Sequence, residues 1–400
     1  MRKVILVLPV TILVVLMVTV FSITGCKKAT TETTVAGETT IAETTAASGT
    51  VTETNFPGLK VGGTVRLLCW DGYQYTDSFK DWATKNNVTI DATMISDNNE
   101  IFAKLKAGDK YDIVTPIQAN IQQLYENDLI APIDYAKVPN SKNIFPAIVK
   151  LMPNVFEGKT YSIPMCSGAN SMVYNSAKLP PFESWNDLLK PELKNKFVLL
   201  DDAIGQITMG AKMIGVKGDP SKITYAQLDQ IKEWLIKVKK NARTIITSFG
   251  EAKTGLESGD ILAWANGNVC VAQWAQLDGY KDIVGMNIPK EGTLYFVDSY
   301  VIPKNAPNMD TALALCNEVL SLNVQIKGVN ENLACGVVTV DAGAALNDVQ
   351  RKLGYPTTDA EMAKILEQNP LNGPFATEEG GQYITIKDMT DAWREVMATQ

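Results

Sequence analysis

The sequence predicts an α/β protein built from two units, and three features support this prediction. Strand and helix patterns alternate as β-α-β-α-β between residues 64 and 116, which is typical of a parallel sheet with right-handed crossovers. A second series of strand and helix patterns begins near Tyr161. Removal of an N-terminal leader of 25 residues leaves 375 of the 400 residues, a length that suits about two domains.

The N-terminus has the pattern of an export signal. Arg2 and Lys3 are basic, and the 22 residues at 4–25 include no charged side chain. This run leads into Ile-Thr-Gly-Cys at 23–26, which resembles the lipobox cleaved by lipoprotein signal peptidase, so Cys26 is the expected lipidation site. A single transmembrane helix is the alternative, because the apolar run is long enough to span a bilayer. Either interpretation places the rest of the chain outside the cytoplasm, tethered to a membrane.

The segment after the leader has the composition of a flexible tether. Residues 26–56 consist mainly of Thr, Ala, Glu, Ser and Gly and contain almost no large apolar side chain. Such a segment cannot bury enough apolar surface to offset the entropy lost on ordering. We therefore expect the folded body to begin near Pro57.

The first part of the body is expected to form a parallel sheet. Its expected elements are a strand at 64–70, a helix from Thr76 or Asp77, a strand at 88–94, a helix at 99–107 and a strand at 111–116. Phe79, Trp82 and Ala83 follow helical spacing after the capping position. In open parallel sheets the ligand crevice lies beyond the carboxyl ends of the strands. This rule directs attention to the residues after Leu68 and around Thr115.

The second part mixes strands and helices, with two clear helix starts. Ser184 is expected to cap a helix at 185–189, and Thr224 forms a capping box with Gln227. The further expected elements are strands at 197–200, 261–265 and 295–301 and helices at 309–322 and 387–397.

Composition excludes several classes of function. The formal charge of −7, which becomes −9 when Arg2 and Lys3 leave with the leader, argues against a nucleic-acid partner. The chain has no histidine, which excludes imidazole-based triads and histidine-ligated metal sites. Phosphate-binding and nucleophile-elbow motifs are missing too, so we expect no enzyme, cofactor or metal site. The six cysteines form no C-x-x-C pair, and those other than Cys26 are expected to be buried thiols.

Several segments resemble a known family. They are 67–73 (Leu-Leu-Cys-Trp-Asp-Gly-Tyr), 184–192 followed by 200–203, and 289–303 (Pro-Lys-Glu-Gly-Thr-Leu-Tyr-Phe-Val-Asp-Ser-Tyr-Val-Ile-Pro). Over most of residues 62–345 the chain is similar to the spermidine/putrescine-binding proteins of polyamine importers, within the two-lobed periplasmic binding protein superfamily. The resemblance implies a type II periplasmic-binding-protein fold: each lobe has a mixed, mostly parallel sheet flanked by helices, and a hinge joins the lobes.

The resemblance also implies how the chain divides between the lobes. Residues 57–165 and 300–345 are expected to form lobe 1, and residues 166–297 are expected to form lobe 2. The C-terminal segment at 346–400 is expected to pack on the lobes, and either lobe is a possible partner.

The resemblance assigns ligand contacts to individual residues. Trp70 and Tyr73 match family aromatics that flank the methylene chain of the ligand. Asp202 matches an acidic residue that meets one ammonium, and Asp298 matches the carboxylate that meets an amine in the second half of the site. Phe296 stands where the family usually has tryptophan.

The chain also departs from the family pattern. Gly205 stands where a second glutamate is common, while Ile117 and Ala119 replace a serine and a tyrosine. Val337 replaces a further tyrosine, and Trp264 is shifted by one position from an expected aromatic. Two acidic anchors and a thinner aromatic box remain, which favours shorter or less symmetric amines over spermidine.

The chemistry of a diamine site explains why these residue types matter. Each ammonium needs a carboxylate, because burial of an unpaired charge is costly, and aromatic faces between the ends add cation–π attraction of about 0.5–2 kcal/mol each. Asp71, in the loop after the first strand, is a third candidate carboxylate. Each candidate also has a structural alternative: Asp202 as a helix N-cap, Asp298 as a group paired within the hinge, and Phe296 and Trp264 as core residues.

Together these observations predict an extracytoplasmic solute-binding lipoprotein of an ABC importer. It is expected to be a monomer, anchored to the cell membrane through lipid on Cys26, that captures a putrescine-like, spermidine-like or other cationic amine between its lobes. Its expected macromolecular partners are the permease subunits, and no nucleic acid. Two alternatives remain open: a protein of the same fold that binds an amino-acid derivative or an anion, and, more remotely, an extracytoplasmic enzyme.

Overall fold

A computed structural model describes residues 58–70, 72–95, 98–217, 219, 221–280, 284–333, 335–352 and 354–399. The expected leader at 1–25, the lipidation site Cys26 and the tether at 26–56 lie outside the described residues, and so does Asp71. Among the described helices, none combines the length and the apolar character that crossing a membrane requires.

The first sheet is parallel and has three strands. Its elements follow one another as β1 (Gly63–Trp70), α1 (Thr76–Asn86), β2 (Val88–Ile95), α2 (Asn98–Ala107) and β3 (Ile113–Val114). Strand β1 lies between β2 and β3 and is parallel to both. Val65, Leu67 and Leu68 on β1 are fully buried, as befits the central strand of a parallel sheet. The predicted β-α-β-α-β order is confirmed.

The third strand is shorter than the predicted range of 111–116. Beyond it the chain runs beside β11 (Tyr295–Tyr300), where the Ser299 N–H donates to the Pro116 carbonyl at 3.1 Å. An extended pattern in the sequence predicts a strand but not its partner. The change of partner after β3 therefore had no signal in the sequence.

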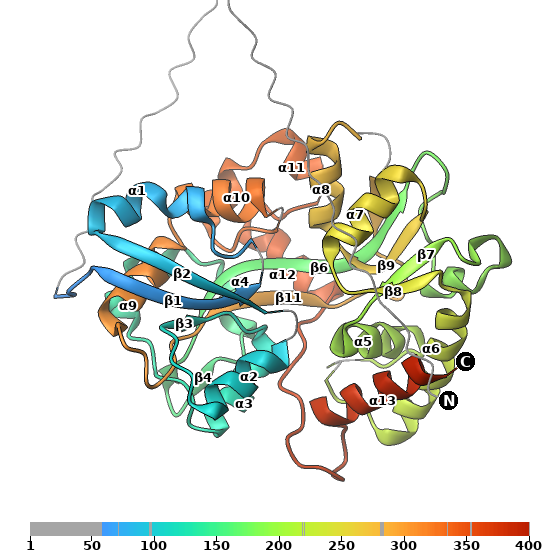
Figure 1. Ribbon diagram of the computed structural model, residues 1–400, viewed down its shortest axis with the longest axis horizontal. Coiled ribbons are helices and arrows are strands. Elements are labelled where there is room, and N and C mark those ends of the chain that lie inside the picture. The colour runs from blue at the N-terminus through green and yellow to red at the C-terminus, as the bar shows by residue number, and fades with distance from the viewer. Residues whose placement is uncertain are drawn as a thin grey trace, which may run out of the picture. The chain divides into compact units, whose positions relative to one another are not determined.

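The second sheet is built on one long strand, β6 (Ile163–Asn175). The sheet has the order β10 (Val284–Asn287), β6, β9 (Ala263–Asn268), β7 (Phe197–Leu200) and β8 (Thr244–Ile246), and β11 also pairs with β6. Strand β7 is parallel to β8 and β9, whereas β6 is antiparallel to all its partners. Residues 163–169 of β6 pair with β11 and residues 170–175 pair with β9 and β10, so β6 connects the two halves of the body (Figure 1).

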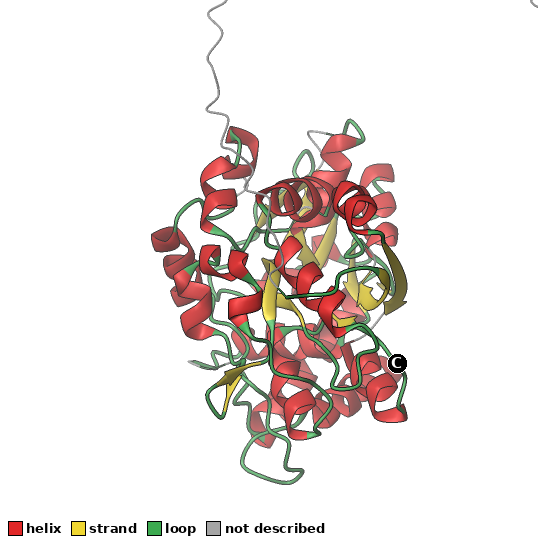
Figure 2. Ribbon diagram, turned by 90° about the vertical axis from the view of Figure 1, so that its left-hand side faces the viewer, coloured by secondary structure: helices red, strands yellow, loops and turns green. Residues whose placement is uncertain are grey.

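The remaining elements are mostly helices, which surround the strands (Figure 2). The other α-helices are α3 (Ile121–Glu126), α4 (Pro146–Leu151), α5 (Ala203–Met213), α6 (Tyr225–Asn241), α7 (Phe249–Ser258), α8 (Val269–Leu277), α9 (Met309–Glu318), α10 (Val340–Ala345), α11 (Asp348–Lys352), α12 (Asp359–Gln368) and α13 (Ile386–Ala398). Short 3-10 helices lie at Gln118–Asn120, Tyr135–Lys137, Pro139–Asn143, Trp185–Leu189 and Pro191–Leu193, and a π-helix lies at Val324–Asn332. Strand β4 (Val155–Phe156) pairs with β5 (Lys159–Thr160).

Two helix starts follow the capping patterns in the sequence. Thr224 forms the predicted capping box at the start of α6. Ser184 also forms a capping box, at the start of a helix over the predicted range Trp185–Leu189, and this helix is of the 3-10 type. The helix ends before Pro191, because the residue before a proline is disfavoured in the α-helical conformation, and Lys190 is extended with a ψ of 136°.

The buried apolar residues fall into three clusters. The largest surrounds β1, β3 and β11 and draws on residues at 65–166 and 295–371, together with Val269 of α8. The second lies among α5, α6 and α13, and the third lies beneath α7 and α8. The C-terminal segment is shared between the two halves, since α12 packs on α4 whereas α13 packs on α5 and α6. The exact lobe boundaries stay predictions.

Candidate ligand-binding site

Strand β11 presents two of the predicted ligand residues side by side. Phe296 and Asp298 are two positions apart, so they share one face of the strand. Phe296 lies opposite Gly168 of β6, and Asp298 lies opposite Cys166. A Cβ atom at Gly168 would lie 2.6 Å from the Phe296 ring, so the ring lies over a position that only glycine can leave open.

The other edge of β11 is held by the loop that follows β3. The Val297 N–H donates to Gln118 Oε1 at 2.9 Å, and Ile117 forms a single bridge with Asp298. Strand β11 therefore lies between β6 and this loop. Ile117, at the position where the resemblance implies serine, lies directly beside the candidate anchor.

Tyr73 reaches Asp298 from the loop after β1. The Tyr73 N–H donates to the Trp70 carbonyl at 3.1 Å, which closes a turn with Gly72 at a φ of +90°, a conformation that favours glycine. The Tyr73 hydroxyl donates a hydrogen bond to Asp298 Oδ2. The Cys166 thiol is 3.5 Å from the Tyr73 oxygen and 4.0 Å from Asp298 Oδ2. The fold thus brings residues 225 positions apart into one polar cluster.

The electrostatic state of Asp298 follows from its burial. Asp298 is only 6% exposed, and Tyr73 is 7% exposed. Burial raises the pKa of Asp298 from 3.8 to about 7, and the hydrogen bond from Tyr73 opposes this rise. Among the described residues, Asp298 has polar contacts with a hydroxyl and a thiol but with no Lys or Arg. The negative charge of this carboxylate is therefore left for a bound cation to balance.

Asp202 lies at the N-terminus of α5, where it caps the helix. Its Oδ2 accepts a hydrogen bond from the Gly205 N–H at 3.1 Å, which confirms the N-cap alternative. A Cβ atom at Gly205 would collide with Asp202 Oδ2 and would lie 2.6 Å from Asn266 Nδ2. Glycine at position 205 therefore leaves room for both the Asp202 carboxylate and the Asn266 side-chain amide.

Asn266 lies beside Gly205, near Asp202, and sequence analysis did not single it out as a candidate. It is 6% exposed and adopts a left-handed φ of +58° on β9, a strained conformation that often marks ligand sites. Asn tolerates this conformation better than most residues, but an Asn-Gly pair in a strand pattern more often indicates a turn. No signal in the sequence separated the two interpretations.

The remaining predicted ligand residues lie in different surroundings. Trp70 is partly buried at the end of β1, against the largest apolar cluster. Trp264 is fully buried in the third cluster, with its ring centroid 5.1 Å from that of Phe249, which favours its alternative role as a core residue; its contact with the ligand stays a prediction. The physical reason for this burial is that β9 is covered on both faces, and Trp264 points to the face under α7 and α8. Two surface hollows, of about 460 Å3 beside α1 and about 200 Å3 beside α3, are lined by other residues.

The cysteines agree with the sequence prediction. Cys69, Cys166, Cys270, Cys316 and Cys335 are buried free thiols. Burial raises the pKa of the Cys166 thiol well above its ordinary value, so the thiol stays neutral beside Asp298.

Comparison with known proteins decides the family. The model of the bacterial extracellular solute-binding proteins matches residues 74–363, more than half of the chain. The chain belongs to this family. Among its relatives are a spermidine/putrescine-binding periplasmic protein of Haemophilus influenzae, 27% identical over 323 residues (78% of this chain and 79% of that protein), and one of Escherichia coli, 27% identical over 319 residues (77% and 81%).

Solved structures show the same fold. The TpPotD lipoprotein of Treponema pallidum has a TM-score of 0.68 at 22% identity and covers 83% of this chain and 99% of its own. The PotD substrate-binding protein of Streptococcus pneumoniae has a TM-score of 0.66 at 21% identity and covers 84% and 99%. This solute-binding protein therefore has the two-lobed type II fold that the sequence predicts, and the family match places it outside the cytoplasm.

Proposed function

We propose that this solute-binding protein captures a small cationic amine and delivers it to the permease of an ABC importer. The observation that supports this is the Asp298 carboxylate, which is 6% exposed and faces a tyrosine hydroxyl and a thiol but no cation among the described residues. Keeping such a carboxylate ionised is costly unless a positive charge lies against it. An ammonium group supplies that charge, and an anion does not.

The aromatic residues around Asp298 support the same ligand class. Phe296 lies on the same face of β11 as the carboxylate, and Tyr73 donates to it. Trp70 begins the turn that places Tyr73. Aromatic faces beside an ammonium add cation–π attraction of about 0.5–2 kcal/mol each. The named ligands of the relatives, spermidine and putrescine, are amines of this kind.

The second end of the site is weaker than the first. Asp202 is engaged by the Gly205 N–H at the N-terminus of α5, where the helix dipole already offsets part of its negative charge. Gly205 contributes no second carboxylate. Two unequal ends favour a shorter or less symmetric amine over spermidine.

The resulting protein is a transport component and not an enzyme. We propose that it is a monomer, lipid-anchored to the cell membrane through Cys26 after removal of residues 1–25, with the tether at 26–56 holding the receptor near its permease. The near-complete enclosure of Tyr73 and Asp298 supports a hinge that opens to admit the ligand and closes around it.

Titration calorimetry with putrescine, spermidine, amino acids and anions tests the proposal. An amine should bind more tightly than the neutral and anionic solutes, with putrescine ahead of spermidine. Tight binding of a neutral or anionic solute, with no binding of any amine, would show that the ligand class is wrong while leaving the family membership intact.

A further inference from the structure

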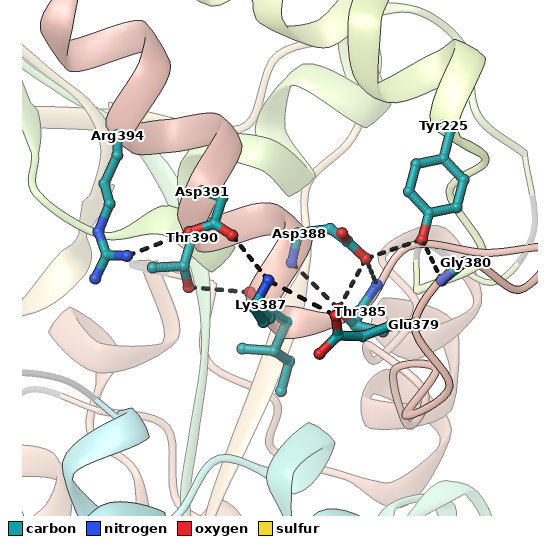
Figure 3. A network of polar contacts seen from close by, with 10 residues as sticks. Tyr225, Glu379, Gly380, Thr385, Lys387, Asp388, Thr390, Asp391 and Arg394 are labelled. Atoms are coloured by element: carbon teal, nitrogen blue, oxygen red, sulfur yellow. Dashed lines mark hydrogen bonds and ion pairs between the residues drawn. The ribbon is translucent and has the colours of Figure 1, made fainter.

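Helix α13 is fixed at its start by a polar network. Thr385 and Asp388 form a capping box, and Asp388 Oδ2 also accepts from the Tyr225 hydroxyl of α6 at 3.1 Å (Figure 3). The same tyrosine oxygen accepts from the Gly380 N–H at 3.0 Å. The buried stripe of α13 packs on α5 and α6. The C-terminal helix is thus fixed by these contacts to the half of the body that carries Asp202.

One residue of α13 contacts Asp201, the neighbour of the candidate ligand residue Asp202. Trp393 is 2% exposed, and its indole N–H donates to Asp201 Oδ1 at 2.7 Å. A buried indole N–H needs an acceptor, and a carboxylate is a strong one. Asp201 is an exposed residue, so this contact, and not packing, fixes its side chain.

Asp201 in turn sets the course of the chain into α5. The Asp201 N–H donates to the Ile246 carbonyl of β8 at 2.8 Å, and its side chain is held by Trp393. The next residue is Asp202, which caps α5 through the Gly205 N–H. Two adjacent carboxylates therefore have different partners: one binds the C-terminal helix and the other binds the start of α5.

We propose that Trp393 is a positioning residue for ligand binding, because it holds Asp201 and thereby fixes the direction in which Asp202 faces the ligand. This inference rests on the proposed role of Asp202 as an amine anchor. It makes the C-terminal helix, more than 190 positions away in sequence, part of the construction of the ligand site.

Three substitutions separate positioning from general stability. Trp393→Phe keeps most of the buried ring and removes the N–H donor. Asp201→Asn keeps an oxygen acceptor for the indole and removes the charge. Trp234→Phe is the matched control: Trp234 is 8% exposed in the same apolar cluster, and its indole N–H donates to Asn186 Oδ1 at 2.9 Å, away from the loop of Asp202.

Calorimetry with putrescine gives the first readout. Trp393→Phe should lower the affinity by about tenfold, equivalent to about 1.4 kcal/mol. Trp234→Phe should bind like the wild type, and Asp201→Asn should lose less affinity than Trp393→Phe, because a neutral amide oxygen still accepts the indole N–H but more weakly than a carboxylate. Equal losses in both tryptophan variants would overturn the inference in favour of general destabilisation. A larger loss in Asp201→Asn than in Trp393→Phe would overturn it too, since Asp201 would then act on the ligand through its charge.

Hydrogen exchange without ligand gives the second readout and keeps the inference separate from the ligand proposal. The Gly205 N–H is protected by Asp202, so its exchange should quicken in Trp393→Phe and stay unchanged in Trp234→Phe. If the wild type binds no amine, the proposed ligand class is wrong, and hydrogen exchange at Gly205 alone tests the positioning role of Trp393. Unchanged exchange at Gly205 in Trp393→Phe would then overturn the positioning role.

Discussion

Replacing Asp298 with Asn should lower the affinity for a cationic amine at least tenfold. Asn has the same shape and can still accept the Tyr73 hydrogen bond, so the substitution removes charge and little else. Truncating one partner of a buried charge pair costs about 2–5 kcal/mol, and each 1.4 kcal/mol corresponds to about tenfold in affinity. Because Asp298 is 6% exposed, solvent screening does little to reduce this cost.

The assay is calorimetry with putrescine at pH 8, where most of Asp298 in the free protein is ionised. Asp112→Asn serves as the control variant. Asp112 is 1% exposed, and its carboxylate accepts from the Arg66 N–H at 2.8 Å and the Asn308 N–H at 2.6 Å. Asp112→Asn removes a buried carboxylate that accepts hydrogen bonds from two backbone N–H groups. The stability of the fold should therefore fall while the affinity for the amine stays near the wild-type value.

Two results would refute this reasoning. Wild-type affinity in Asp298→Asn would show that the carboxylate does not meet the amine. Equal losses of affinity in Asp298→Asn and Asp112→Asn would show that disturbance of the fold, and not charge, weakens binding.

Further predictions concern pH, the second anchor, the lipid and the hinge. Amine affinity should fall about tenfold for each pH unit below about 7, since Asp298 must release a proton to pair with an ammonium, and a flat titration profile between pH 5 and 8 would count against this role. The Asp298 carboxyl group has a higher pKa in the folded protein than in the unfolded chain, so the folded protein keeps this proton to a higher pH. The stability that the bound proton contributes is therefore lost as pH rises from 3.8 to about 7. Thermal unfolding of the ligand-free protein should therefore show Asp298→Asn gaining stability over the wild type across that window, and parallel curves would contradict it. Asp202→Asn should weaken amine binding less than Asp298→Asn does, and calorimetry that ranks the two in the opposite order would reverse the assignment of strong and weak ends. Cys26→Ala should block processing and membrane attachment, as followed by mass spectrometry of the expressed protein, whereas normal cleavage before residue 26 would disprove the lipoprotein. Saturation with the best amine should reduce the radius of gyration measured by X-ray scattering, and an unchanged value would exclude hinge closure.

Local patterns predicted the elements of the fold well. The order of β1 to β3 and the capping box at Thr224 depend on residues close in sequence, and both are present. The short helix after Ser184 ends at the predicted residue, before Pro191, whereas its 3-10 type had no signal in the sequence. The placement of α12 and α13 on different halves of the body depends on packing between distant segments, for which the sequence has no local pattern.

The family resemblance predicted individual residues of the candidate site. The contacts between those residues depend on tertiary packing and could not be predicted from the sequence. Phe296 and Asp298 share a face because of the period of a strand. The hydrogen bond from Tyr73 to Asp298 depends on the whole sheet arrangement. Trp264 was ambiguous because β9 is covered on both faces, so strand alternation could not tell a core face from a ligand face. Asn266 could not be predicted as a site candidate, because an Asn-Gly pair more often indicates a turn than a strand.

Two buried carboxylates in this chain show how partners decide the role of a side chain. Asp112 accepts from two backbone N–H groups, which stabilise its charge and fix β1 and the start of α9. The described partners of Asp298 are a hydroxyl and a thiol, which orient its carboxylate without neutralising it. The proposed role of Asp298 implies that the unmatched charge persists in the ligand-free protein and that a bound cation removes its cost. We therefore expect Asp298 to be dispensable for folding and necessary for binding, and we expect the reverse for Asp112.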